Sequence, residues 1–374
     1  MFVKMETNVS VDNSKSRPVY LDHASTTPVD PEVAALVMHY MVEEFGNAGS
    51  RTHVYGAAAA KAVQRAREQV AEVVSGRPDD VIFTSGATEA NNLAILGLAE
   101  HGLSEGRRHI VSTQIEHKAV LEPLEEMERR GFEVTLVAPE RSGRVSEESV
   151  LREVREDTLL VSVMTVNNET GVIQPVVEIA EGLSDGGPYF HTDAAQAYAK
   201  LEGVLCHPRI DMISVSGHKI RAPKGVGSLI LKRRQYRRAP IKPLLYGGGQ
   251  ERGLRPGTLP VQLIAAMGLA CQKTCRSQPG HQELDRTIQE WMRDLDNRFG
   301  HHGLRIAGES APKVGWIRMV SVDPSFDSEA LIIALKDVAS VSNGSACTST
   351  EYTSSHVLHA MGADHLNSFI RLSQ

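Results

Sequence analysis

The sequence has 374 residues, of which 41% are hydrophobic and 23% are charged, and its formal net charge at pH 7 is -6. This is the composition of a folded globular chain that is long enough for two domains, so it excludes a wholly disordered protein. The negative net charge gives no electrostatic basis for general nucleic-acid binding, because phosphate contacts need a basic surface.

No stretch has the long uncharged apolar run of a membrane-spanning helix. The segment Met1 to Arg17 is polar, whereas a secretion signal would be a basic stretch that leads into an apolar core. We therefore expect a cytoplasmic protein without membrane contact, in which residues 1–18 form an N-terminal tail.

Apolar runs that end in polar or glycine-rich turns alternate with helix-like segments in the region 31–260. This alternation predicts an α/β domain with a largely parallel sheet that is covered on both faces. Ligands of such sheets collect at the carboxyl ends of the strands. The clearest predicted strands are Val81–Thr84, His109–Ser112, Val134–Val137, Leu159–Met164, Tyr189–Thr192, Met212–Val215 and Gly227–Leu231.

The pattern changes after Thr258. A long helical segment is predicted from Val261 to Phe299, followed by a strand at Ile317–Val322 and a helix at Ser328–Lys336. We expect these elements to form a second, smaller α+β domain.

The chain has four cysteines, Cys206, Cys271, Cys275 and Cys347, which are too few for a disulfide framework and form no CxxC pair. Cys271 and Cys275 lie four residues apart in a helical pattern, so they could hold a soft metal, but buried cysteine is more often a small apolar residue. The sequence therefore predicts free thiols and no metal site.

Two charged side chains follow predicted strands and suggest a cofactor site. Lys219 in Ser216–Lys219 would bring an amine to the carboxyl edge of the sheet, and Asp193 follows the strand Tyr189–Thr192. Pyridoxal phosphate (PLP) needs a lysine for its Schiff base and commonly a carboxylate against its pyridine nitrogen. Alternatively, the lysine is a solvated surface charge and the aspartate caps a turn.

Two further segments fit the same cofactor. Thr84–Asn92 lies between a strand and a predicted helix, so its free amides and the hydroxyl of Thr88 would form a phosphate cradle. His117 follows another strand, where an imidazole could stack on a ring or move protons. Each segment is generic when taken alone, because turns of this kind often contain glycine and threonine and the chain has 15 histidines.

Cys347 lies in a run of small polar residues, Asn343–Thr350, which predicts an exposed loop and an accessible thiol nucleophile. Arg371 alternates with apolar residues in Phe369–Ser373, as an inward-facing strand charge would. A guanidinium binds a carboxylate through two parallel hydrogen bonds, which suits an amino-acid substrate.

The whole set resembles the cysteine desulfurases of the NifS/IscS type, which are PLP-dependent enzymes of the aspartate-aminotransferase fold. The motifs are individually generic, but their joint order along one chain is specific. They are Tyr20–Pro28 (YLDHASTTP), Thr84–Glu89 (TSGATE), Glu116–Lys118 (EHK), Val166–Gly171 (VNNETG), Asp193–Gln196 (DAAQ), Ser216–Lys219 (SGHK), Arg255–Thr258 (RPGT) and Gly344–Ser349 (GSACTS).

The resemblance implies a PLP-dependent transferase of fold type I with a mainly parallel seven-stranded sheet in the large domain, residues 31–260. Residues 19–30 and 261–374 would form the small domain that carries the catalytic cysteine loop. Relatives usually continue beyond the position of Arg371 into a C-terminal helix, whereas this sequence has three residues after it.

The resemblance also implies a role for each site residue. Lys219, Cys347 and His117 would be catalytic, with Lys219 as the Schiff-base lysine and His117 as the ring-stacking acid or base. Asn168 and Arg371 would bind the substrate carboxylate. The remaining cofactor contacts would be Asp193 to the pyridine nitrogen, Gln196 to the phenolic oxygen, Ala87, Thr88, Ser216 and His218 to the phosphate, and Thr258 to the cofactor of the second subunit.

The implied reaction converts L-cysteine to L-alanine and leaves the sulfur on Cys347 as a persulfide. Family members are homodimers that deliver sulfur to acceptors in iron-sulfur cluster assembly, tRNA thiolation or DNA phosphorothioation, and the resemblance extends to the DndA-like branch that serves the last. The alternatives are a selenocysteine lyase, another PLP enzyme of fold type I, and a non-catalytic sulfur scaffold. The basic run Lys232–Arg238 is interpreted as a solvated loop, and no direct nucleic-acid binding is expected.

Overall fold

A computed structural model of the chain describes residues 17–276, 281–299, 304–321, 327–344, 355–363 and 368–374. Most of the predicted N-terminal tail and the whole of 345–354, which includes Cys347, lie outside these residues. None of the described helices is long and apolar enough to cross a membrane.

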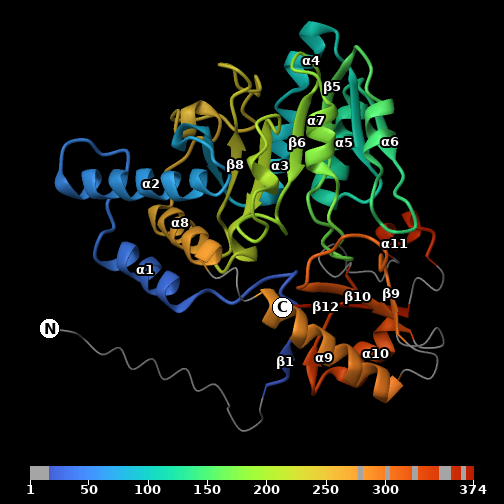
Figure 1. Cartoon of the computed structure of the whole chain (residues 1–374). Helices are drawn as coiled ribbons and strands as arrows, with labels where there is room; N and C mark the ends of the chain where they lie inside the picture. The colour runs from blue at the N-terminus through green and yellow to red at the C-terminus, as the bar shows by residue number, and fades with distance from the viewer. Residues whose placement is uncertain (1–16, 277–280, 300–303, 322–326, 345–354, 364–367) are drawn as a thin grey trace, which may run out of the picture.

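A seven-stranded sheet forms the centre of the larger part of the molecule (Figure 1). Its strand order is β2-β8-β7-β6-β5-β3-β4, and β8 runs in the opposite direction to the other six strands. The predicted α/β class and mainly parallel seven-stranded sheet are therefore confirmed. The strands are β2 (Val81–Thr84), β3 (His109–Thr113), β4 (Glu133–Val137), β5 (Thr158–Ser162), β6 (Tyr189–Asp193), β7 (Met212–Ser216) and β8 (Gly227–Leu231).

The central strands are buried along their whole length, which explains their nearly continuous apolar sequences. Alternate side chains point to opposite faces. Ile110 and Leu160 pack into one core cluster, whereas Val111 and Val161 pack into another on the opposite face. Strand β4 lies at the edge of the sheet and is largely exposed.

Helices cover both faces of this sheet (Figure 1). The first core cluster contains residues of α3 and α5, and the second contains residues of α2, α7 and α8. The helices of the larger part are α1 (Pro31–Val42), α2 (Val54–Glu72), α3 (Ala87–Leu96), α4 (Ala99–Glu105), α5 (Lys118–Arg129), α6 (Glu147–Arg152), α7 (Val176–Gly182) and α8 (Val261–Arg276), with short helical turns η1 (Pro78–Asp80), η2 (Val204–Cys206), η3 (Gly217–Lys219) and η4 (Glu251–Gly253).

The helical segment predicted from Val261 to Phe299 is two helices, α8 and α9 (His281–Phe299). Helix α8 packs against α1 and α2. A Cβ atom on Gly268 would lie 2.7 Å from the Cα atom of Ala66, so glycine permits the close approach of α8 to α2. The domain division at residue 260 stays a prediction, and this packing supports grouping α8 with the larger part.

The smaller part is built on a three-stranded sheet in the order β12-β10-β9, formed by β9 (Arg305–Ile306), β10 (Ile317–Ser321) and β12 (Phe369–Ser373). A short parallel pair, β1 (Val19–Tyr20) and β11 (Ala339–Ser340), joins the N-terminal segment to it. Leu21 packs in the same core cluster as Ile370 and Leu372. The helices of this part are α9 and α10 (Ser328–Leu335), whereas α11 (His356–Ala360) packs into the core of the larger part through Val357 and Leu358.

Arginines of the basic run Lys232–Arg238 form ion pairs with acidic side chains. Arg234 lies 3.5 Å from Asp211, and Arg238 lies 3.0 Å from Asp80, and both carboxylates are buried. The interpretation as a solvated loop is therefore wrong for these arginines, because their charges neutralise buried acids beneath the loop.

Candidate active site

A cavity of about 470 Å³ opens at the carboxyl ends of β6 and β7, between the larger sheet and β12. This is the edge at which ligands of parallel sheets bind. Of the predicted site residues, Thr258 does not line the cavity and is exposed, and Cys347 lies outside the described residues. The cavity is lined by all the others, Ala87, Thr88, His117, Asn168, Asp193, Gln196, Ser216, His218, Lys219 and Arg371.

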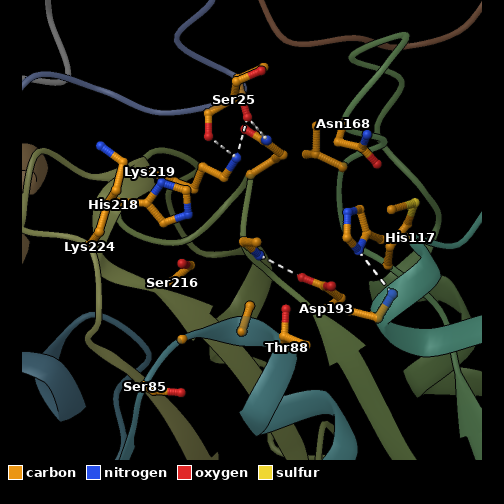
Figure 2. Close-up of a pocket in the computed structure, with 18 of the residues that line it drawn as sticks. Ser25, Ser85, Thr88, His117, Asn168, Asp193, Ser216, His218, Lys219 and Lys224 are labelled. Atoms are coloured by element: carbon orange, nitrogen blue, oxygen red, sulfur yellow. Dashed lines mark hydrogen bonds between the residues drawn. The ribbon is translucent and has the colours of Figure 1, made fainter. Parts of the chain in front are cut away.

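Lys219 ends the turn η3, directly after β7. Its Nζ atom donates to the backbone oxygen of Ser25 at 2.7 Å and to that of Ala24. Figure 2 shows the lysine and Ser25 on one side of the cavity, opposite Asp193 and Thr88. The amine is therefore held at the cavity by the backbone oxygens of Ala24 and Ser25.

Asp193 is the last residue of β6 and is buried. One carboxylate oxygen, Oδ2, accepts from Nδ2 of Asn91 at 2.7 Å, and the other, Oδ1, accepts from the backbone N–H of Ala195 at 2.9 Å. The turn-capping alternative is therefore correct for Oδ1. These two donors stabilise a buried carboxylate that also lines the cavity.

His117 is the N-cap residue of α5, where its Nδ1 atom accepts from the backbone N–H of Ala119 at 3.0 Å. Burial lowers the pKa of this imidazole below its usual value, so the ring is neutral near pH 7. Because Nδ1 accepts a hydrogen bond, the neutral ring carries its proton on Nε2. Figure 2 shows His117 beside the cavity, near Asn168 and Asp193.

Helix α3 begins at the cavity without a side-chain cap. The backbone amides of its first turn, at Ala87 and Thr88, are therefore available to an anion, and the helix dipole favours negative charge there. Glycine at 227 lets β8 approach this turn, because a Cβ atom would lie 2.6 Å from the Cα atom of Gly86. These features fit a phosphate group, with the Ser216 hydroxyl also lining the cavity.

His218 and Lys224 line the same end of the cavity (Figure 2). Burial, together with nearby lysines, lowers the pKa of His218 to about 4, so this ring is neutral at pH 7. Its Nδ1 atom lies 3.1 Å from the hydroxyl of Thr26. The positive charge at this end comes from the lysines and the helix terminus.

Gln196 donates through Nε2 to the backbone oxygen of Ala24 at 2.9 Å, while its buried Oε1 atom has no hydrogen-bond partner among the described residues. A buried amide oxygen without a partner is unfavourable unless a ligand supplies a donor. Together with the amine, the buried carboxylate and the free helix amides, this atom fits PLP, whose phenolic group can donate.

Arg371 lies in β12 and is only 1% exposed. Its guanidinium donates to Asp22 and to the hydroxyl of Ser25, each at 2.7 Å, and to the backbone oxygen of Asn168 at 3.0 Å. The Nε atom has no partner among the described residues. A buried guanidinium that keeps one free donor and lines the cavity is suited to binding a carboxylate.

Sequence reasoning assigned no role to Asp22, Ser25, Asn91, Glu116 or Lys224, although the structure places each of them in or behind the cavity. Asp22 and Ser25 stand in a motif that carries the family resemblance, and Glu116 precedes His117. Their positions in the sequence therefore indicated that they lie near the site. No local pattern identifies Asn91, because its contact with Asp193 joins residues that are 102 positions apart.

Glu116 is fully buried beside the cavity. Its Oε1 atom accepts from Thr113 at 2.9 Å and from the backbone N–H of Met164 at 2.8 Å, while Oε2 has no partner among the described residues. Burial raises the pKa of this carboxyl to about 8, and the nearby charge of Asp193 adds to the rise. The side chain is therefore a neutral acid at pH 7.

The raised pKa of Glu116 makes the protein less stable as pH increases. Between about pH 4.5 and pH 8 the folded state keeps a proton that the unfolded chain releases. The carboxyl therefore lowers the free energy of unfolding by about 1.4 kcal/mol per pH unit in this range. We expect Glu116→Gln to remove this contribution, so that the variant gains stability over the wild type as pH rises.

Denaturant unfolding of both proteins measures the difference in their free energies of unfolding. It is carried out at several pH values from 5 to 8, about the range between the unfolded and folded pKa values of Glu116. The variant Glu125→Gln, which changes an exposed glutamate of the neighbouring helix, controls for the loss of a surface charge. A stability difference between Glu116→Gln and wild type that did not change with pH would contradict the raised pKa.

Comparisons with known proteins agree with this geometry. The aminotransferase class-V family model matches residues 19–373. Cysteine desulfurase of Rattus norvegicus is 42% identical over 354 residues, which are 93% of this chain and 76% of the rat protein. Cysteine desulfurase IscS of Acinetobacter baumannii (strain AYE) is 42% identical over 368 residues, covering 96% of this chain and 88% of that protein.

Two solved structures are similar along nearly their whole length. DndA from Streptomyces lividans superposes with a TM-score of 0.80 at 47% identity and covers 95% of this chain and 99% of that chain. SspA in complex with cysteine superposes with a TM-score of 0.81 at 32% identity, covering 95% and 98%. The chain therefore belongs to the aminotransferase class-V family, among its PLP-dependent cysteine desulfurases.

Proposed function

We propose that this protein converts L-cysteine to L-alanine and takes the substrate sulfur onto Cys347 as a persulfide. The observation that carries the proposal is the single cavity in which an amine, a buried carboxylate, an unpaired helix terminus and a buried guanidinium converge. Bound PLP would supply an aldehyde that condenses with amines and a ring that withdraws electrons from the substrate.

The phosphate of the cofactor would lie at the first turn of α3, where the amides of Ala87 and Thr88 and the hydroxyl of Ser216 are available. Asp193 would face the ring nitrogen and keep it protonated, which stabilises the negative charge that develops when the substrate loses a proton. His117 would stack on the ring and offer its Nε2 proton. These assignments are supported by the position of each group at the cavity.

The substrate carboxylate would bind at Arg371, with Asn168 beside it. The hydrogen bonds from Arg371 to Asp22 and Ser25 hold the guanidinium in place before the substrate arrives, which reduces the ordering needed on binding. Lys219, once released from its carbonyl partners, would act on the cofactor and on the substrate proton. Cys347 would attack the substrate sulfur as a thiolate, so that the carbon skeleton leaves as alanine.

The test is to incubate the purified protein with PLP, cysteine and a reductant and to quantify alanine and sulfide. We expect equal amounts of the two products and a visible absorption band of the bound cofactor. Lys219→Ala is expected to lose that band and at least about a hundredfold in product formation, because the proposed nucleophilic amine is removed and Lys224, which also lines the cavity, lies beside His218 at the proposed phosphate end. Lys61→Ala, which changes an exposed lysine of α2, is the charge-matched control. A wild-type protein that stayed colourless and left cysteine unchanged would exclude this function.

We propose that the sulfur acceptor belongs to DNA phosphorothioation rather than to iron-sulfur cluster assembly or tRNA thiolation. The 47% identity to DndA, against 42% to IscS, supports this choice. The choice of acceptor is tested by deleting the gene in its own host. Phosphorothioate in DNA and thiolated nucleosides in tRNA are then measured. Loss of tRNA thiolation with unchanged DNA would contradict the choice.

We further propose that the protein is a cytoplasmic homodimer in which Thr258 reaches the cofactor of the second subunit. Thr258 is exposed and lies outside the cavity of its own chain, which supports a role across an interface. Exposed aromatic side chains, Phe45 at 67% and Tyr246 at 86% exposure, support burial against a second copy. Light scattering during size-exclusion chromatography would report a monomer if the proposal is wrong.

A further inference from the structure

Asn91 on α3 is completely buried, with 0% of its surface exposed. Its Nδ2 atom donates to Oδ2 of Asp193 at 2.7 Å, while its own Oδ1 atom has no hydrogen-bond partner among the described residues. Around it, Ala90, Leu93 and Ala94 are buried apolar side chains of the same helix. A buried amide oxygen without a partner destabilises a fold, and an apolar side chain at this position would avoid that loss.

The contact between Asn91 and Asp193 therefore has opposing effects on stability, because it pairs a buried carboxylate oxygen and leaves the amide oxygen of Asn91 without a partner among the described residues. An aspartate carboxylate turns readily about its last side-chain torsion, which has a broad energy minimum. Here each oxygen has its own donor, Asn91 for Oδ2 and the backbone N–H of Ala195 for Oδ1. The donor to Oδ1 comes from the backbone of the following turn, so Asn91 is the side chain that fixes the second oxygen.

From this geometry we propose that Asn91 is a positioning residue for Asp193, whose amide fixes the rotation of the carboxylate so that the remaining lone pairs face the pyridine nitrogen of PLP. The inference rests on the role of Asp193 in the proposed function. Asn91 itself does not line the cavity and does not touch the substrate.

The proposal predicts different effects on folding and on cofactor binding. Asn91→Leu removes the donor to Asp193, which costs stability, and the unpartnered oxygen, which restores stability, so the thermal midpoint of the apoprotein is expected to change little. The affinity for PLP is expected to fall by about tenfold, since a charge-assisted hydrogen bond that orients the carboxylate is lost. A purely structural role would instead lower the thermal midpoint and the affinity together.

The experiment titrates apoprotein with PLP and follows the absorption of the bound cofactor, and it measures the thermal midpoint of the same apoprotein. Asn91→Ala is the second variant, for use if leucine does not fit. Asn92→Leu is the matched control, because the adjacent amide is half-buried and donates to the backbone oxygen of Thr88 in its own helix. The control is expected to bind PLP as the wild type does.

Wild-type PLP affinity in a folded Asn91 variant would overturn the proposal. So would a loss of affinity that is matched by a loss of thermal stability, and so would failure of both variants to fold, since Asn91 would then be needed for folding. A failure of the proposed function itself is seen separately, because the wild-type protein would then bind no PLP or would leave cysteine unchanged.

Discussion

Asp193→Ala is expected to lower the rate of alanine formation from cysteine by on the order of 10² to 10³, with a much smaller effect on folding. The carboxylate is proposed to hold a proton on the cofactor nitrogen, and without it the ring cannot stabilise the negative charge of the deprotonated substrate. The folded protein loses two hydrogen bonds, from Asn91 and from the amide of Ala195, but it keeps the core of the sheet.

Rates of alanine formation and thermal unfolding curves, measured on the same preparations, check this prediction. Asp185→Ala, which removes an exposed acidic side chain, is the control for a change of charge. If turnover and stability fell in parallel, Asp193 would have a structural role. The proposed function would then need another group that keeps the cofactor nitrogen protonated.

Cys347→Ser is expected to abolish persulfide and sulfide formation while the cofactor band stays at its wild-type intensity. A hydroxyl is a poor nucleophile toward sulfur, and the proposed cofactor contacts are made by other residues, which line the cavity. The prediction follows from the sequence, because Cys347 lies outside the residues that the structure describes.

Mass spectrometry of the protein after reaction with cysteine locates the added sulfur, and a sulfide assay gives the rate. Cys206→Ser and Cys275→Ser, which change half-buried thiols away from the cavity, are the controls. Continued sulfide formation by Cys347→Ser would exclude the cysteine as the sulfur carrier and would favour another PLP reaction of the same fold.

Apart from the exposed edge strand β4, the strands of the large sheet were predictable because they are buried and therefore read as short apolar runs. The site was predictable where a polar side chain directly follows such a run, as at Asp193, His117 and Lys219, since parallel strands end at a common edge. For these residues, position along the chain already implied proximity in space.

Other features depend on contacts that no local pattern contains. The amphipathic pattern of α8 shows that one face is buried, but not that α1 and α2 cover it. The helical segment from Val261 to Phe299 was predicted without its interruption, although Pro279 and Gly280, which lie between α8 and α9 in the sequence, are a break signal.

Ser25 joins two functional groups that come from distant parts of the chain. Its backbone oxygen accepts from Lys219, and its hydroxyl accepts from Arg371 of β12. A movement of this one residue would therefore disturb the contacts of the amine and of the guanidinium at the same time. For protein engineering, the segment 19–30 belongs with the cavity, because its removal would take away the Ala24 and Ser25 carbonyl acceptors of Lys219 and the Asp22 and Ser25 side-chain acceptors of Arg371.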